Sequence, residues 1–155
     1  MSTNLLLVSP YNVNFYGGVQ NQVNLFKNGL DSFNFNVRLL APDSSDYDIG
    51  KSIKIPFNGS SNPISLIPNR EILNEAIAWA DIIHIHEPFI PLLFWRLKTS
   101  KKIVVTHHAK ISKFIYLGLK FLYLTLRNKN FYSTAVSDEA KTNALTLSKL
   151  SLIHI

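Results

Sequence analysis

Short, largely apolar runs alternate along the chain with longer segments of helical periodicity. The short runs are typical of strands because Pro or turn-forming residues bound them. Strands are predicted at 4–9, 36–41, 52–56, 81–86, 102–106 and 131–136. Helices are predicted from 18 for about three turns, at 70–79, 92–98 and 112–128, and from 138 after a cap at Ser137, with a last apolar piece at 150–155. The alternation predicts an open, mostly parallel α/β sheet with helices on both faces.

Three of the connecting loops are expected at one edge of this sheet. They follow the first, fourth and fifth predicted strands and cover Pro10–Gly18, Glu87–Pro91 and His107–Lys113. In an open parallel sheet, a ligand binds beyond the carboxyl ends of the strands, near the point where the strand order reverses. The functional site is therefore expected among these loops.

Gly17-Gly18 opens a predicted helix at this edge. Free backbone N–H groups and the positive helix end can face an anion there, and glycine lets a phosphate approach closely. The pair fits neither a GxGxxG nor a Walker pattern, so a dinucleotide or P-loop site has little support. Two interpretations remain open, namely a phosphate site or glycines that serve only a tight turn.

His107-His108 directly follows a predicted buried strand, which places at least one imidazole at the sheet edge. That ring could hydrogen-bond a substrate hydroxyl or stabilise developing charge, and Lys113 could contact a phosphate from the next helix. The alternative is a pair of packed, structural histidines. Together with the histidines of 84–86 and Glu87 they could be drawn as a zinc site, but the spacing is not diagnostic and no metal is predicted.

The composition limits the chain to one ordinary globular domain. It has 155 residues, of which 46% are hydrophobic and 17% charged. It contains no Cys, which excludes disulfides and thiolate metal sites. The N-terminus lacks the features of a signal peptide, and the longest apolar stretch, 114–126, is too short to span a bilayer. A cytoplasmic protein without a transmembrane helix is therefore expected.

Positive charge is concentrated between Glu87 and Asp138. This stretch holds nine basic residues and no acidic one, whereas the rest of the chain holds 7 basic and 10 acidic residues. Such a stretch attracts phosphate groups, nucleic acid or an anionic membrane surface, or serves solubility alone. The aromatic residues near it lie mostly inside apolar runs, which argues against nucleic acid as a partner.

A basic side is predicted on the helix at 112–128. Lys113, Lys120 and Arg127 recur on it at seven-residue intervals, and aromatic and aliphatic residues cover most of the rest. Such a helix could lie in a membrane interface with its cations on anionic headgroups. It could equally be a core helix whose cations extend to water.

Several short motifs occur together in a fixed order along nearly the whole chain. They are Pro10-Tyr11 with Gly17-Gly18-Val19-Gln20, Ala41-Pro42, Ile55-Pro56-Phe57-Asn58-Gly59-Ser60, His84-Ile85-His86-Glu87-Pro88, Thr106-His107-His108 with Lys113, and Ala135-Val136-Ser137. In this order they resemble the N-terminal half of family 4 GT-B glycosyltransferases, closest to the phosphatidyl-inositol mannosyltransferase-like members. The resemblance implies a Rossmann-like domain that forms one half of a GT-B architecture.

The resemblance also implies roles for individual residues. Gly17 and Gly18 would bind the donor diphosphate, and His108 would lie beside the transferred sugar as the catalytic residue. The acceptor-binding residues would be Tyr11, Gln20, Asn58 and Lys113, with the lysine on the acceptor phosphate. The sequence departs from the family at Asn14, where an acidic residue is usual, and lacks the basic residue that follows the Asn-Gly-Ser motif.

The resemblance implies that residues 1–155 form the acceptor-side domain, with the nucleotide-sugar domain absent from this chain. The expected reaction transfers a sugar from a nucleotide sugar, a co-substrate and not a cofactor, to a hydroxyl of a lipid-linked or phosphorylated polyol. The lone chain is expected to be inactive without a donor domain or a separate donor chain, and an anionic membrane surface at the inner face of the cytoplasmic membrane is a further expected partner. The alternatives are a non-catalytic membrane-surface or partner-binding module, and a truncated fragment.

Overall fold

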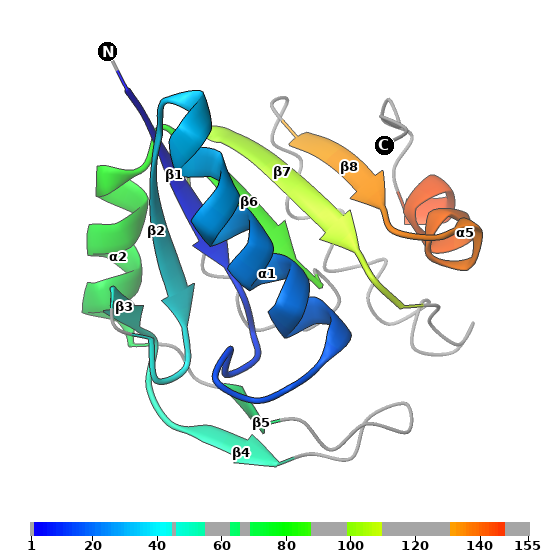
Figure 1. Ribbon diagram of the computed structural model, residues 1–155, viewed down its shortest axis with the longest axis horizontal. Coiled ribbons are helices and arrows are strands. Elements are labelled where there is room, and N and C mark those ends of the chain that lie inside the picture. The colour runs from blue at the N-terminus through cyan, green and yellow to red at the C-terminus, as the bar shows by residue number, and fades with distance from the viewer. Residues whose placement is uncertain are drawn as a thin grey trace.

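In the part of the chain that the structure describes, six strands form one sheet in which all neighbours are parallel. The computed structural model describes residues 2–44, 46–54, 63–65, 69–87, 99–109 and 131–147. In sheet order the strands are β3 (Tyr47–Asp48), β2 (Phe35–Ala41), β1 (Thr3–Val8), β6 (Ile82–His86), β7 (Lys102–His107) and β8 (Phe131–Ala135) (Figure 1). The predicted open, parallel α/β sheet is confirmed.

The strand order reverses between β1 and β6. From β1 the chain adds β2 and β3 on one side, then crosses back to place β6, β7 and β8 on the other. This is a Rossmann-like order, in which a crevice lies outside the carboxyl ends of the two central strands. The loops that leave β1 and β6 flank this switch point.

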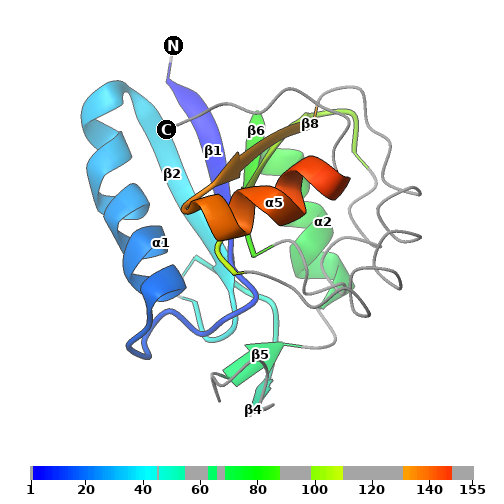
Figure 2. The ribbon, with the colours of Figure 1, turned by 90° about the vertical axis from the view of Figure 1, so that its right-hand side faces the viewer.

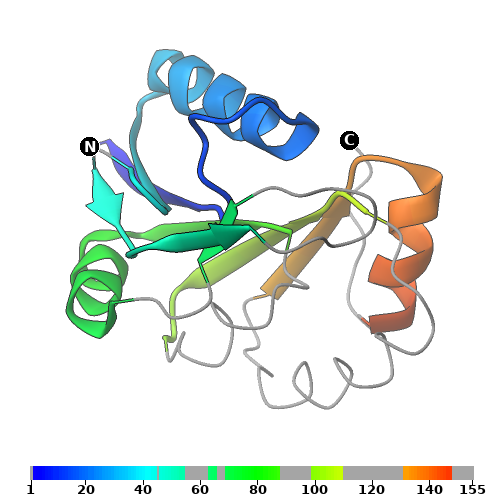
Figure 3. The same ribbon diagram turned by 90° about the horizontal axis from the view of Figure 1, so that it is seen from below.

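Helices cover both faces of the sheet, as predicted. α1 (Gly18–Gly29) packs on one face and α2 (Arg70–Trp79) on the opposite face (Figure 3). A short 3-10 helix (Leu30–Phe33) leads from α1 towards β2, and α5 (Asp138–Leu147) packs against β7 and β8.

The apolar residues of β1 alternate between two cores. Leu5 and Leu7 pack in the core under α1, whereas Leu6 and Val8 pack in the core under α2. A strand covered on both faces requires such a continuous apolar run. Burying these side chains contributes about 1.5–3 kcal/mol each, which makes β1 a main source of stability.

A second, smaller sheet lies beyond the carboxyl ends of β1 and β2 (Figures 1 and 2). It consists of β4 (Ser52–Lys54) and β5 (Pro63–Ser65), which pair in antiparallel orientation. The strand predicted at 52–56 is thus present over 52–54, but outside the main sheet. One edge strand of the main sheet is β3, which the sequence pattern missed because two residues carry no periodicity.

Polar side chains close the starts of two helices. Asn69 Oδ1 accepts the backbone N–H of Glu71 at 3.0 Å at the start of α2. Ser137 Oγ accepts the N–H of Ala140 at 3.2 Å, which confirms the predicted cap of α5. Each cap satisfies a backbone donor that has no partner within its helix.

The end of α2 is closed by a lysine from another element. Lys101 Nζ donates to the carbonyls of Ile77 and Ala78 at 2.7 Å each, and to the carbonyl of Ala80. A cation is favourable at the negative end of a helix. One of the nine basic residues between Glu87 and Asp138 is therefore engaged within the fold.

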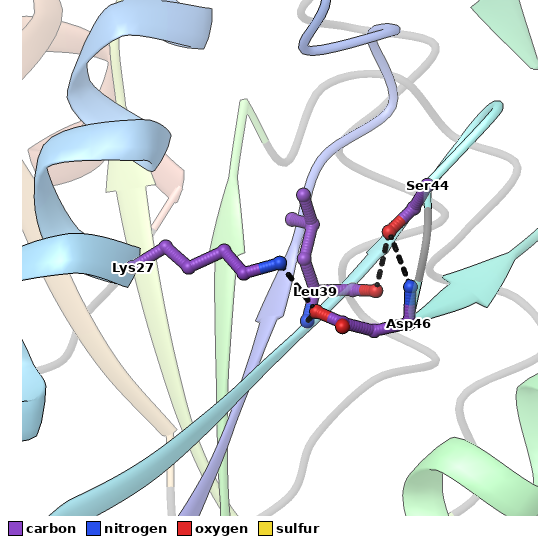
Figure 4. A network of polar contacts seen from close by, with 4 residues as sticks. All are labelled: Lys27, Leu39, Ser44 and Asp46. Atoms are coloured by element: carbon purple, nitrogen blue, oxygen red, sulfur yellow. Dashed lines mark hydrogen bonds and ion pairs between the residues drawn. The ribbon is translucent and has the colours of Figure 1, made fainter.

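An ion pair ties α1 to the turn between β2 and β3 (Figure 4). Lys27 Nζ lies 2.6 Å from Asp46 Oδ2, which also accepts the backbone N–H of Leu39 at 2.9 Å. Ser44 Oγ donates to the Leu39 carbonyl at 3.0 Å and accepts the Asp46 N–H at 3.2 Å. Because β3 does not extend to Leu39, these side chains satisfy the backbone of β2 at the sheet edge.

Some predicted elements lie outside the described residues. They are the helices at 92–98 and 112–128, the latter with its basic side, and the apolar piece at 150–155. Among the described residues, no helix is long and apolar enough to cross a membrane.

Candidate functional site

The loop after β1 is held against the small sheet. Tyr11 forms an antiparallel bridge with Ile64, and backbone hydrogen bonds on both sides of the bridge join the same two segments. Burial raises the pKa of Tyr11 above its ordinary value, and the nearby Glu87 carboxylate raises it further. The phenol therefore keeps its proton and can both donate and accept a hydrogen bond.

Gly17 makes room for the side chain of Gln20. Only 1% of Gln20 is exposed, and a Cβ atom on residue 17 would overlap its amide group. The φ of Gly17 is 179°, an extended value that any residue adopts. The lack of a side chain at this position therefore leaves space for the Gln20 amide and does not serve a tight turn.

The amide of Gln20 is buried without a hydrogen-bond partner. Neither Oε1 nor Nε2 has one among the residues that the structure describes. Leaving such a group unsatisfied costs about 1–3 kcal/mol, so buried amides are normally paired. Its position at the start of α1 makes Gln20 a candidate to bind a hydroxyl of a ligand.

The start of α1 is open. No side chain caps it, its first turn contains no acidic residue, and a Cβ on Gly18 would meet no atom within 4 Å. The first N–H groups of a helix carry partial positive charge that calls for an acceptor. This helix start can therefore hold a phosphate or diphosphate.

Three imidazoles stack along the ends of β6 and β7. His86 pairs with Thr106 in the strand register, which places His108 just beyond it on the same face. His86 Nδ1 and His108 Nε2 lie 3.1 Å apart, and the rings of His86 and His84 have centroids 4.3 Å apart. Phe26 of α1 packs on both His84 and His86.

Burial keeps these histidines neutral. It lowers the pKa of His84 and of His108 to about 4 and that of His107 to about 3, and it lowers the pKa of His86 further. The positive charge that His108 would carry lowers the pKa of the other three in addition. Near neutral pH each ring is therefore an uncharged donor and acceptor.

Glu87 ends β6 with an unusual backbone conformation. Its φ is 55°, in the left-handed region that residues with a side chain rarely adopt, and only 5% of the residue is exposed. Its N–H donates to the Thr106 carbonyl at 3.0 Å, and its carboxylate lies close enough to the backbone N–H of His108 for that N–H to lower its pKa. Burial raises the pKa of Glu87 to about 7, and the N–H of His108 opposes part of that rise.

A chain of hydroxyl groups orients His84. Thr134 Oγ1 donates to the Val105 carbonyl at 3.2 Å, so its single proton is used there. Thr106 Oγ1, 2.7 Å from Thr134 Oγ1, must then donate to it and accept from His84 Nε2, also at 2.7 Å. His84 therefore carries its proton on Nε2.

The structure brings most of the predicted site residues to the edge at the switch point. Tyr11 follows β1, and His108 follows β7. Glu87 lies near both, since its charge raises the pKa of Tyr11 and the backbone N–H of His108 lowers the pKa of Glu87. The segment Gly17–Gln20 begins α1, the helix whose Phe26 covers the histidines. Among the described residues, no three His, Asp or Glu side chains are arranged to hold a metal ion.

Two predicted site residues lie outside the part of the chain that the structure describes, and three buried residues near His108 were not predicted as part of the site. Asn58 and Lys113 lie outside the described residues, so their roles stay predictions. From the sequence, His86 and Glu87 were considered only for a zinc site that was not predicted, and Thr106 was given no role, although all three are buried around His108. The available signal was their location at strand ends beside the switch point.

This combination of a Rossmann-like parallel sheet with an open helix start and clustered polar groups at its switch point defines a Rossmann-like α/β domain, consistent with one half of a GT-B glycosyltransferase. The sequence profile of Glycosyltransferase Family 4 matches residues 16–145. The chain therefore belongs to glycosyltransferase family 4.

Curated relatives support the family assignment. The chain is 30% identical over 127 residues to phosphatidyl-myo-inositol mannosyltransferase of Mycobacterium leprae. The aligned region covers 73% of this chain and 33% of the relative. It is 31% identical over 148 residues to the protein of the same name from Mycolicibacterium smegmatis, which covers 87% of this chain and 38% of the relative. The chain thus spans about a third of the length of these relatives. No solved structure matches it significantly.

Proposed function

We propose that the chain is the acceptor-side domain of a glycosyltransferase that moves a sugar from a nucleotide sugar to a hydroxyl of a lipid-linked or phosphorylated polyol. The observation that carries the proposal is the open start of α1 at the switch point, with the partnerless Gln20 amide beside it. The helix start suits a diphosphate, and the amide suits a hydroxyl. Because the chain spans about a third of the length of its relatives, a further domain or a partner chain would hold the rest of the donor.

The acceptor is bound on the side of Tyr11 and Gln20. A phenol and an amide each offer a donor and an acceptor, which is what the hydroxyls of a polyol require. Asn58 would add a second amide, and Lys113 would hold the acceptor phosphate as a point charge. The names of the relatives support an acceptor of this chemical class.

The chemistry requires no protein nucleophile. The bond between the anomeric carbon and the diphosphate oxygen breaks, a bond to the acceptor oxygen forms, and the proton of the acceptor hydroxyl passes to the leaving diphosphate oxygen. The domain contributes by positioning the acceptor and by stabilising the leaving diphosphate at the start of α1 near Gly17 and Gly18. His108, neutral near pH 7, hydrogen-bonds the transferred sugar.

A lipid-linked acceptor would bring the protein to an anionic membrane surface. The basic residues between Glu87 and Asp138 favour such a surface, apart from Lys101, which is bound to α2. Vesicle binding by the chain is therefore expected to weaken as salt is raised. Binding that is absent at low salt would remove the membrane from the proposal.

The function is tested by a transfer assay with the protein expressed from its complete gene. The donors are radiolabelled GDP-mannose and UDP-glucose, and the acceptor is phosphatidylinositol in vesicles. We expect labelled lipid from one donor, a KM for the lipid that rises about tenfold in Gln20→Ala, and a kcat that falls about tenfold or more in His108→Ala. The residue-matched control is Gln22→Ala on the same helix, which leaves KM unchanged. Wild-type kinetics in both site variants would overturn the assignment of the site, and the 155-residue chain alone is expected to give no turnover.

A further inference from the structure

Two consecutive residues at the end of β6, its last residue His86 and the following Glu87, lie against His108, the candidate catalytic residue just beyond the neighbouring strand β7. The His86 ring meets the His108 ring, with Nδ1 and Nε2 3.1 Å apart. The backbone N–H of Glu87 donates to the Thr106 carbonyl at 3.0 Å, and its carboxylate lies near the backbone N–H of His108. Contacts thus reach both the side chain of His108 and the main chain that leads to it.

We propose that His86 and Glu87 are positioning residues that fix His108 in one orientation and one tautomer, with its proton on Nδ1. The proposal deepens the proposed function and rests on it only for the contact between His108 and the sugar. The tautomer itself follows from the hydrogen bonds within the chain.

The tautomer follows from the partner of each ring nitrogen. The bond between the rings needs one donor and one acceptor, because both rings are neutral. If His108 Nε2 donated, the proton of His86 would lie on its own Nε2, a buried atom without a partner among the described residues. A buried donor without a partner is less tolerated than a buried acceptor. His86 therefore donates from Nδ1, His108 accepts at Nε2, and the proton of His108 lies on Nδ1.

The His86 ring is itself held in place. It is fully buried, with the ring of His84 on one side at a centroid distance of 4.3 Å and Phe26 of α1 at 5.7 Å. His84 is anchored through Nε2 to the hydroxyl of Thr106 at 2.7 Å. A ring packed in this way cannot turn over to exchange its two nitrogens without moving its neighbours.

Glu87 holds the backbone on which His108 stands. Its own N–H donates to Thr106, two residues before His108, and its carboxylate lies near the N–H of His108 itself. The left-handed φ of 55° turns the chain at the end of β6. Side-chain-bearing residues persist in that conformation where the surrounding contacts require it, and such residues cluster at functional sites.

The consequence for the reaction is that His108 offers a donor and not a base. With Nε2 occupied by His86, the nitrogen without a partner among the residues that the structure describes is Nδ1, which carries the proton. A fixed N–H suits an oxygen of the transferred sugar that must be held during transfer. A ring free to exchange tautomers would spend part of its time with no donor there.

The tautomer is measured on the 155-residue chain with nitrogen-labelled histidine in a long-range proton–nitrogen spectrum. We expect His108 to carry its proton on Nδ1. His86→Leu removes the donor and should give a mixture of tautomers, whereas His86→Asn, which places an amide donor where Nδ1 lies, should keep the wild-type state. Lys102→Met is the control, because it changes an exposed side chain at the start of β7, away from His86 and His108, and the tautomer should not change.

Two outcomes overturn the proposal. One is a wild-type His108 with its proton on Nε2, which needs no variant to fold. The other is an unchanged His108 tautomer in a His86→Leu chain whose cooperative thermal unfolding shows that it is folded. For Glu87, exchange of the His108 backbone N–H should become faster in Glu87→Ala and stay slow in Glu87→Gln, and equal exchange in both would remove Glu87 from the proposal.

The kinetic test uses the protein from its complete gene. His86→Leu should lower kcat about three- to tenfold with an unchanged KM for the acceptor, and His86→Asn should restore it. A wild-type kcat in His86→Leu would contradict the positioning role. If the wild-type protein transfers no sugar, the proposed function fails, while the spectrum still decides the tautomer.

Discussion

At the scale of single residues, Gly17 and Gly18 have different tasks although they are neighbours. At Gly17 the amide of Gln20 occupies the space that a Cβ atom would take, whereas at Gly18 the space for a Cβ atom is empty. The sequence pattern could indicate a glycine pair before a helix, but not which glycine faces protein and which faces a ligand. That distinction depends on the rotamer of Gln20, three residues away.

Alanine at these two positions is expected to act on different properties. Gly17→Ala should displace the Gln20 amide and weaken acceptor binding as much as Gln20→Ala does, because the new Cβ occupies its place. The free energy of unfolding should fall by less than about 1 kcal/mol, since a flexible side-chain end can move and the extended backbone suits alanine. Calorimetric titration with glycerophosphoinositol and thermal unfolding measure the two effects.

Gly18→Ala is the matched control for that experiment. Its Cβ meets no atom, so acceptor binding should be unchanged and stability equal or slightly higher. Combining Gly17→Ala with Gln20→Ala should add nothing to either single change, because both remove the same group. Wild-type acceptor affinity in Gly17→Ala would contradict this account of Gly17.

At the scale of elements, the long strands and α2 could be predicted because their apolar patterns are set locally. β3 and β5 could not, since two and three residues show no period and β5 begins with Pro63, a residue that strands disfavour. The sequence also did not indicate that Lys101 binds the carbonyls at the end of α2. In the sequence this lysine is one more cation in a basic stretch, and only the fold brings it to the end of a helix more than 20 residues earlier.

Removing Lys101 from α2 is expected to destabilise the chain. Lys101→Met keeps the length of the side chain but leaves the carbonyls of Ile77 and Ala78 without their donor. The free energy of unfolding should fall by about 1–2 kcal/mol in urea titrations. Lys102→Met, next to it and exposed, is the control and should change it by less than about 0.5 kcal/mol. An equal effect of both changes would show that the contact with α2 contributes nothing.

At the scale of the whole molecule, the site depends on contacts between distant segments. The switch-point edge could be expected from the alternation of strands and helices, and Tyr11, Gln20 and His108 could be chosen as candidates from their motifs. The contact between His86 and His108 could not, because it depends on the register of β6 against β7. The left-handed backbone of Glu87 could not either, since glutamate has no preference for it.

The buried histidines are expected to make the chain sensitive to acid. Their pKa values are about 3 to 4 for His84, His107 and His108 when folded, against about 6.5 when unfolded, so the unfolded chain binds more protons between these values. Stability is therefore complete above about pH 6.5 and is lost as the pH falls towards 4. Melting temperatures measured from pH 7 to pH 4.5 should decrease throughout, and a flat profile would contradict the buried, neutral state of these rings.

Glu87 acts in the opposite direction over a similar range. Its pKa of about 7 in the folded chain lies above the ordinary value of 4.5, so ionisation destabilises the fold as the pH rises from 4.5 to 7. Glu87→Gln should therefore be more stable than wild type at pH 7.5 and no more stable at pH 4. The same melting experiment measures this, and a variant that is less stable than wild type at pH 7.5 would show that the carboxylate is stabilised in the fold.

The central claim is that this domain alone binds the acceptor head group at the switch-point edge. The most direct test is a titration of the isotope-labelled 155-residue chain with glycerophosphoinositol, followed by backbone amide shifts. The account predicts saturable shifts confined to the loop around Tyr11, the start of α1 at Gly18 and Gln20, and the ends of β6 and β7 at Glu87 and His108. No saturable shift, or shifts centred away from this edge, would contradict it.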